Sequence, residues 1–306
     1  MRLLVTGGCG FVGSTFIRYI LQHYGPEMVT NVDSLVSGTL ASVDGLAREF
    51  GERYEFLQAD LGDSEKIDTL LASHPFFAVV NFASASETGA AGMASLLERA
   101  RVHGVRRFVQ VSNDRVTSAG GWDGDGAEGA PEGADRRQAT ADAVALEGYR
   151  KHKQEVVLTR AASNYGFFQA PGEFIPACII SALRDEPAAV PGDGSSVRDW
   201  LHVEDHCSAI FAALLSGRPG AIYHLAGGEK VRDIEVAQAI LEHLGKSRES
   251  IRFAPVSKKD EHALPGDVHL AEEQLAWKPR KHLSTALTET VDWYVHHREW
   301  WEAQLR

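Results

Sequence analysis

Three glycines near the amino terminus have the spacing of a phosphate-binding turn. Gly7, Gly10 and Gly13 follow a short apolar run and open a segment with helical periodicity. One such glycine permits the sharp bend, one lets a pyrophosphate approach the backbone, and one lets strand and helix pack closely. The first N–H groups of the helix then carry partial positive charge toward the phosphates. The pattern predicts a dinucleotide site. Its predicted turn consists of Gly7, Gly10, Phe11, Val12 and Gly13.

A carboxylate at the end of the second predicted strand indicates which dinucleotide binds. Asp33 lies 20 residues after Gly13. A carboxylate there accepts hydrogen bonds from a ribose 2′-hydroxyl and repels a 2′-phosphate, which favours NAD over NADP. The alternatives are a glycine turn without a ligand and an Asp33 that is only a surface carboxylate. The rest of the predicted cofactor set follows the third and fourth strands: Asp60 (at the adenine edge), Leu61, Phe82 and Ala83.

The elements that must hold these residues alternate along the first 165 residues. Short β-branched runs are separated by helical patterns, which is typical of a parallel sheet covered on both faces. We expect a Rossmann-type doubly wound α/β fold with a smaller α/β carboxy-terminal substrate lobe. The predicted strands are Leu3–Thr6, Met28–Val32, Tyr54–Gln58, Phe77–Phe82, Phe108–Ser112 and Val156–Arg160. The predicted helices are Phe11–His23, Ser64–Leu71, Met93–His103 and Ala139–Lys151.

The texture of the chain changes after residue 166, where Pro and Gly punctuate shorter elements. We therefore predict a cofactor domain over 1–166, completed by about 201–228, and a substrate lobe from 167–200 and 229–306. The tail from Thr285 to Trp301 has the pattern of one amphipathic helix. The Gly-, Asp- and Glu-rich stretch from Ser118 to Gly133 cannot bury enough surface to order itself and is predicted to be a mobile loop.

Composition excludes several classes of partner. The 306 residues carry a net charge of −11, which argues against nucleic acid or an anionic membrane as the main partner. Three cysteines are an odd number spread far apart and match no zinc spacing, so we expect no metal and a reducing, cytoplasmic location. The apolar stretch at the amino terminus is too short for a signal peptide.

Residues 159–206 carry a series of motifs that point to a family. The series is Thr159–Gly166, Phe174–Pro176, Gly192–Gly194 and Val197–His206. It resembles the extended short-chain dehydrogenases that act on sugar nucleotides, in particular the dTDP-glucose 4,6-dehydratase group. The resemblance covers nearly the whole chain.

This resemblance implies a dTDP- or UDP-linked sugar as substrate and a homodimer built on the helices near Met93–His103 and Ala139–Lys151. A buried core face is the alternative for those helices. The resemblance assigns Arg198 to a diphosphate, for which a guanidinium offers planar paired donors. Arg198 could instead pair with Asp199 or Glu204. Asn164 could bind a phosphate or cap its own turn.

The reactive half of the site departs from the family. The family uses a Tyr-x-x-x-Lys pair, in which the tyrosinate takes a proton and the lysine orients the cofactor. Counting back from Asn164 places Ala134 and Gln138 at these two positions. A literal pair, Tyr149 and Lys153, lies only three residues before the strand at Val156. It is therefore predicted to be a solvated helix end.

The segment after the fifth strand has changed as well. Dehydratases of the family carry Thr-Asp-Glu there, and this chain has Asn113-Asp114-Arg115. Arg115 reverses the charge of the base that would abstract the sugar C5 proton. The predicted catalytic residues are Asp114, Asn113 and Ser112, with Glu87 and His152 as weaker candidates. A basic run of the carboxy-terminal lobe is replaced by residues 257–264, where Lys258 and Lys259 could still meet a phosphate but are more typical of a solvated surface.

Two functions remain after this comparison. The first is an NAD-binding enzyme that modifies a sugar nucleotide with an altered active site and is not an ordinary 4,6-dehydratase. The second is a non-catalytic NAD-binding protein that serves as a partner subunit or a redox sensor. Fold analogy cannot choose between them.

Overall fold

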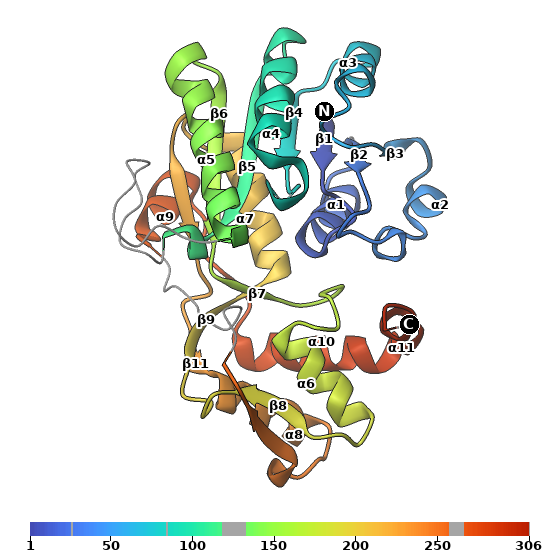
Figure 1. Cartoon of the computed structure of the whole chain (residues 1–306), viewed down its shortest axis with the longest axis vertical. Coiled ribbons are helices and arrows are strands. Elements are labelled where there is room, and N and C mark those ends of the chain that lie inside the picture. The colour runs from blue at the N-terminus through green and yellow to red at the C-terminus, as the bar shows by residue number, and fades with distance from the viewer. Residues whose placement is uncertain (26, 84, 118–132, 257–265, 306) are drawn as a thin grey trace.

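The computed structural model describes residues 1–25, 27–83, 85–117, 133–256 and 266–305, with backbone only at 85–88, 117 and 133–135. The described chain contains a seven-stranded parallel sheet in the order β10-β6-β5-β4-β1-β2-β3 (Figure 1). The strands are β1 (Arg2–Thr6), β2 (Met28–Asp33), β3 (Tyr54–Gln58), β4 (Ala78–Asn81), β5 (Arg107–Asn113), β6 (Glu155–Ala161) and β10 (Ile222–Leu225). The order reverses between β1 and β4, which is where a doubly wound sheet binds its ligand.

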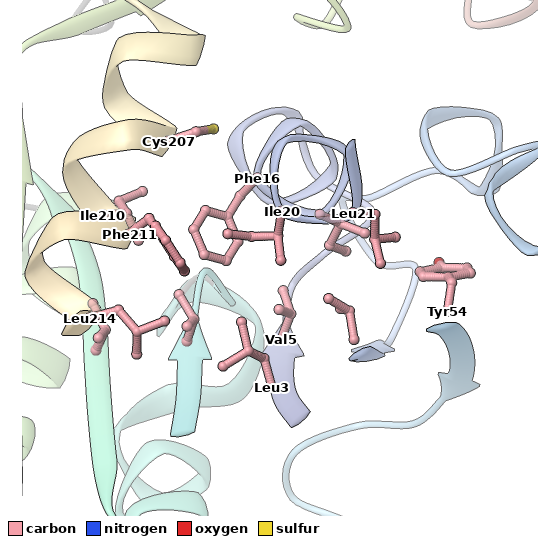
Figure 2. Packing of buried hydrophobic residues seen from close by; sticks show 14 of the residues in the cluster. Leu3, Val5, Phe16, Ile20, Leu21, Tyr54, Cys207, Ile210, Phe211 and Leu214 are labelled. Carbon is pink, nitrogen blue, oxygen red and sulfur yellow. The ribbon is translucent and has the colours of Figure 1, made fainter. Parts of the chain in front are cut away.

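Alternation along β1 sends side chains into two separate cores. Leu3 and Val5 pack under α1 (Phe11–His23) and α7 (Val203–Ser216), whereas Leu4 packs on the opposite face. Figure 2 shows Leu3 and Val5 pointing toward Phe16 and Ile20 of α1. The opposite face is covered by α3 (Ser64–Ser73), α4 (Ala85–Val102) and α5 (Gly133–His152). Because both faces are buried, the central strands β1 and β4 are almost continuously apolar.

The link between β2 and β3 contains three short elements that the sequence pattern did not indicate. They are η1 (Leu40–Ser42), α2 (Leu46–Phe50) and η2 (Gly51–Arg53). Each spans five residues or fewer, which is too short for a hydrophobic period to be recognised.

The carboxy-terminal part of the chain has two small sheets and its own core (Figure 1). A three-stranded sheet has the order β11-β9-β7, and β8 pairs with β12. These strands are β7 (Ser163–Tyr165), β8 (Ala188–Pro191), β9 (Val197–His202), β11 (Lys230–Arg232) and β12 (Ile251–Ala254). The helices and the 3-10 turn of this part are α6 (Phe174–Leu183), α8 (Asp233–His243), η4 (Arg248–Ser250), α9 (His269–Leu275), α10 (Leu283–His296) and α11 (Arg298–Ala303). A further 3-10 turn, η3 (Asp114–Thr117), directly follows β5.

The Rossmann-type fold and every strand predicted from the sequence are confirmed, but the single tail helix is wrong. His297 leaves helical dihedrals, with φ −112 and ψ 44, and separates α10 from α11. The indole of the fully buried Trp301 donates to the carbonyl of Tyr294 at 2.9 Å. In an unbroken helix the N–H of residue 298 would occupy that carbonyl, so the break lets Trp301 enter the core.

Two predictions concern segments that the structure does not describe. The predicted mobile loop over 118–132 and the replaced basic run over 257–264 lie outside the described residues, and residue 133 already belongs to α5. In the described part of the chain, no helix has both the length and the apolar character needed to cross a bilayer.

Candidate active site

Of the three glycines in the predicted pattern between β1 and α1, one faces open space and two do not. Gly7 has φ +72, and a Cβ on it would lie 2.5 Å from the backbone N of Ala83. A Cβ on Gly13 would lie 2.5 Å from the carbonyl oxygen of Gly7. At Gly10 the added Cβ would meet, among the described residues, only that same carbonyl at 3.4 Å. Gly7 and Gly13 are therefore required by packing, whereas Gly10 leaves the approach that a pyrophosphate needs.

The start of α1 is suited to an anion. Gly10 is its N-cap, and within the described structure no side chain caps the helix and no acidic residue occupies its first turn. The partial positive charge of its first N–H groups is therefore not neutralised by a side chain of the helix itself. These features fit the phosphates of a dinucleotide.

Asp33 is fixed directly beside this turn. Its carboxylate accepts hydrogen bonds from the backbone N–H groups of Cys9 and Leu35, both at 2.8 Å. The side chain is 5% exposed, so the alternative of an ordinary surface carboxylate is wrong. Two backbone donors hold the carboxylate at the end of β2, where a ribose hydroxyl could still donate to its remaining lone pairs.

The other predicted cofactor residues follow the neighbouring strand ends. Asp60 is exposed after β3, and its Oδ1 accepts from the N–H of Gly62 at 2.6 Å. Leu61 is buried in the core beneath it. Phe82 follows β4 and its ring lies 5.3 Å from the ring of Phe16. All of these residues lie at the carboxyl ends of parallel strands, which meet at one edge of the sheet.

A cavity of about 300 Å³ joins the glycine turn to the predicted catalytic and substrate residues. That volume lies at the lower end of the range for small-molecule sites. Its walls also include Arg115, Gln169, Glu173 and Trp200. The predicted residues that line it are Phe11, Val12, Asn113, Asp114, Asn164 and Arg198.

Asp114 is the buried carboxylate of this cavity. Its side chain is 2% exposed, and its Oδ1 lies 2.6 Å from Nδ1 of His224. Burial raises the pKa of Asp114 above its ordinary value, while the hydrogen bond with His224 and the charge of Arg160 oppose that rise. The carboxyl therefore stays protonated to a higher pH than an exposed aspartate, which suits proton transfer.

Ser112 is engaged in a buried network behind the cavity. Its hydroxyl donates to Asp142 at 2.8 Å, and the guanidinium of Arg160 donates to the same carboxylate at 3.3 Å. Gln138 donates to Asp142 at 3.3 Å and to the carbonyl of Val111 at 3.5 Å. Burial raises the pKa of Asp142 to about 6. Ser112 thus supports the end of β5, which differs from the catalytic role predicted for it.

Arg198 has a partner that the sequence did not indicate. Its Nε and Nη2 donate to the two oxygens of Asp233 at 2.7 and 2.6 Å, and both side chains are buried. The sequence had offered Asp199 and Glu204 as alternative partners. Asp199 accepts a hydrogen bond from the N–H of Gly227, and the Glu204 carboxylate lies 2.8 Å from the ammonium group of Lys281. The pairing of β9 with β11 brings Asp233 alongside Arg198.

The sequence offered two roles for Asn164, binding a phosphate and capping its own turn. Its amide donates to the carbonyl of Ala162 at 3.1 Å, and its Oδ1 is buried without a partner in the described structure. It lines the cavity rather than capping the turn at Tyr165 and Gly166.

Tyr149 lies at the far end of the sheet from the glycine turn. It belongs to the last turn of α5, and its ring packs on Gly220. The N–H of Gly220 donates to the carbonyl of Val156, at the amino end of β6. The turn at Gly7 follows the carboxyl end of β1, and the two strands run parallel. His152 lies in the same last turn of α5, so this end of the helix brings neither candidate to the cavity, and the Glu87 side chain is not among those described.

A match to a sequence profile assigns the chain to a family. The profile of the NAD dependent epimerase/dehydratase family matches residues 3–226. The chain belongs to this family. In the residues that the structure describes, no group of three His, Cys, Asp or Glu side chains could hold a metal ion. The predicted cofactor, NAD, is confirmed at the level of the family.

Within the NAD-dependent epimerase/dehydratase family, the chain is similar to proteins named dTDP-glucose 4,6-dehydratase. The chain is 35% identical to dTDP-glucose 4,6-dehydratase of Streptomyces niveus over 325 residues, which cover 99% of this chain and 95% of the relative. It is 33% identical to dTDP-glucose 4,6-dehydratase of an Actinoplanes species, covering 98% of this chain and 100% of the relative.

A solved structure supports the same placement. The dTDP-glucose 4,6-dehydratase of Bacillus anthracis, in complex with NAD, superposes with a TM-score of 0.91 at 32% identity and 99% coverage of both chains. The chain is thus a dTDP-glucose 4,6-dehydratase-like member of the extended short-chain dehydrogenases.

Sequence reasoning missed two residues of the site, His224 and Asp233. His224 is 110 residues from Asp114 along the chain, and Asp233 is 35 from Arg198. No short-range spacing signals either contact, since each depends on which strands pair.

Proposed function

We propose that the protein binds NAD and a dTDP- or UDP-linked sugar in the cavity, and modifies the sugar by a reaction other than ordinary 4,6-dehydration. The observation that carries this proposal is that Phe11 and Val12 of the glycine turn line the same cavity as Asp114, Asn164 and Arg198. The names of the relatives favour a dTDP-linked ligand.

Within this proposal each described residue has a distinct task. NAD, when bound through the glycine turn and Asp33, supplies a hydride acceptor. Asp114 holds or accepts a proton at the sugar. Arg198 offers its guanidinium to the diphosphate, with Asp233 fixing the plane of that group through two hydrogen bonds. Asn164 adds a buried amide oxygen on the cavity wall.

Altered chemistry is supported by the residues around Asp114. Arg115 lines the cavity at the position where a dehydratase needs a base for the C5 proton. A guanidinium cannot serve as that base, because it stays protonated in proteins. Gln138 donates to Asp142 and Val111, and Tyr149 packs at the other end of the sheet. These placements favour a site without the Tyr-x-x-x-Lys pair.

A second candidate is a non-catalytic NAD-binding protein acting as a partner subunit or sensor. Gln138 favours it, because this side chain occupies the expected lysine position and directs its amide into the buried network around Asp142. Such a residue cannot lower the pKa of a neighbouring proton donor by charge.

Assembly and location are part of the same proposal. We propose a homodimer formed through α4 and α5, which pack side by side on one face of the sheet. The three cysteines are free and buried, which suits the cytoplasm. The cavity would lie where the cofactor domain meets the substrate lobe, at the boundary predicted near residue 166.

Ligand titration tests the proposal. Purified protein is titrated with NAD alone and then with NAD and a panel of dTDP- and UDP-sugars, followed by thermal shift and by absorbance in the reduced-nicotinamide band. Further stabilisation by a sugar nucleotide with growing absorbance supports the enzyme. Stabilisation by NAD alone supports the binding protein, and accumulation of a 4-keto-6-deoxy sugar would contradict the claim of altered chemistry.

A further inference from the structure

The contact between Asp114 and His224 joins two strands that are not neighbours. Asp114 follows β5, and His224 belongs to β10 at the edge of the seven-stranded sheet. Strand β6 lies between them, so the imidazole reaches past the carboxyl end of β6 to meet the carboxylate at 2.6 Å. The aspartate is 2% exposed and the histidine 17% exposed. A short hydrogen bond between such enclosed groups is strong and oriented.

The position of the imidazole is shaped by a glycine. A Cβ on Gly266 would lie 2.7 Å from both Cε1 and Nδ1 of His224 and 2.8 Å from Nε2. No left-handed φ is recorded at Gly266, so the requirement for glycine there is a matter of space. A methyl group at 266 would have to displace the ring, because the imidazole is the movable end of its side chain.

The charged groups around the pair come from several elements. Arg160 of β6 is the Cα partner of His224, and its guanidinium is held by Asp142 of α5. Burial raises the pKa of Asp114, and the charges of His224 and Arg160 oppose that rise; burial also raises the pKa of Asp199 on β9, to which the charge of Asp114 adds. Among the described residues, the wall of the cavity adds the charged side chains of Arg115, Glu173 and Arg198.

We propose that His224 is the positioning residue of Asp114: it fixes the carboxyl group at the cavity by sharing a proton with it through one short hydrogen bond. Asp114 then acts as one half of a carboxylate–imidazole pair, whose protons belong to the pair rather than to either residue. The role of the pair in turnover rests on the function proposed above, but the pairing itself is measurable in the protein without any substrate.

The pairing has a direct physical consequence for Asp114. Burial alone would favour the protonated carboxyl, and the imidazole offsets part of that effect. Replacing the imidazole by a neutral amide keeps a hydrogen-bond donor but removes the positive charge. Asp114 should then hold its proton to a higher pH.

The test is the titration of Asp114 followed by ¹³C NMR in protein labelled at aspartate carboxyl carbons. Asp114→Asn assigns the signal. We expect His224→Asn to raise the titration midpoint of Asp114 by about one pH unit or more. Gly266→Ala leaves both partners in the sequence unchanged but pushes the His224 ring away, so it should also raise the titration midpoint of Asp114. Melting temperatures of both variants verify that they are folded.

A matched control exists on the surface. His243 and Asp292 form a second histidine–carboxylate contact at 2.7 Å, with the carboxylate 58% exposed. His243→Asn should leave the midpoint of Asp114 unchanged. An equal midpoint in wild type, His224→Asn and Gly266→Ala would overturn the proposal. A raised midpoint in protein that turns over no sugar nucleotide would leave the pairing intact and count only against the proposed function.

Discussion

The ring of Tyr149 packs on Gly220, so closely that a Cβ on this glycine would lie 2.5 Å from Cδ1 of the tyrosine. The ammonium group of Lys153 lies 5.4 Å from the centre of the same ring. In the only Tyr-x-x-x-Lys of the sequence, the lysine therefore lies over the ring of the tyrosine, at the amino end of β6.

Tyr149→Phe provides the first prediction. Because the hydroxyl is remote from the glycine turn, we expect NAD affinity and any sugar-nucleotide-dependent reduction of NAD to stay within about twofold of wild type. Lys153→Ala should behave alike. A loss of about 10²-fold or more in either variant, measured by absorbance, would mean that this pair has been rebuilt into a reaction centre.

The glycines of the turn make the second prediction. Gly10→Ala should fold normally, since Gly10, the N-cap of α1, has φ −77 and the added methyl meets open space. The methyl occupies the approach of the pyrophosphate, so NAD affinity should fall about tenfold or more, as measured by calorimetry. Gly25→Ala is the control, because nothing described lies within 4 Å of its Cβ.

Gly7→Ala should behave differently from Gly10→Ala. Its left-handed φ and its contact with Ala83 make the substitution destabilising by about 2 kcal/mol or more in urea unfolding. Equal stability of the two variants would contradict the division of roles within the turn.

Asp114→Asn is the third prediction. The amide cannot accept a proton from a sugar hydroxyl, so sugar-nucleotide-dependent NAD reduction should fall by about 10²–10⁴-fold. NAD binding should be retained, because Asp114 is not part of the glycine turn. An unchanged rate, with ligand binding verified by thermal shift, removes Asp114 from the candidates.

Acid lability from His206 is the fourth prediction. Burial lowers the pKa of this imidazole to about 3, and in the described structure neither ring nitrogen has a partner. The unfolded chain binds this proton near pH 6.5, so the stabilising contribution is complete above about pH 6.5 and is lost as the pH falls toward 3. Between pH 6.5 and 4.5 the loss amounts to about 2 kcal/mol.

His206→Leu removes the group whose protonation destabilises the fold in acid. The free energy of unfolding, measured by urea unfolding from pH 7 to 4.5, should therefore fall less steeply with acid in the variant than in wild type. His202 has its pKa lowered to about 3 by burial and keeps its own contribution of the same sign. Parallel curves for His206→Leu and wild type would contradict a buried neutral imidazole.

How much of the site could be predicted depends on how local its determinants are. The turn through Gly10 and Gly13 and the position of Asp33 at the end of β2 follow from the sequence, because a strand, a tight turn and a helix occupy a continuous stretch of chain, whereas their contacts with a cofactor stay a prediction. The helix boundaries of α1 and the bounds of β3 were predicted to the residue for the same reason. The role of Ser112 could not be read from its residue type, which permits either a catalytic or a supporting role; its contact with Asp142 is visible only in the tertiary structure.

The sequence by itself determined the doubly wound sheet, the cofactor turn and the carboxylate that ends β2, since periodicity and short-range spacing encode all three. Tertiary structure alone decided the partners of the two charged groups in the cavity. Arg198 meets Asp233 because β9 pairs with β11, and Asp114 meets His224 because β10 takes its place at the sheet edge beside β6. Contacts of this kind follow from strand order and register, which bring together residues that no local pattern connects.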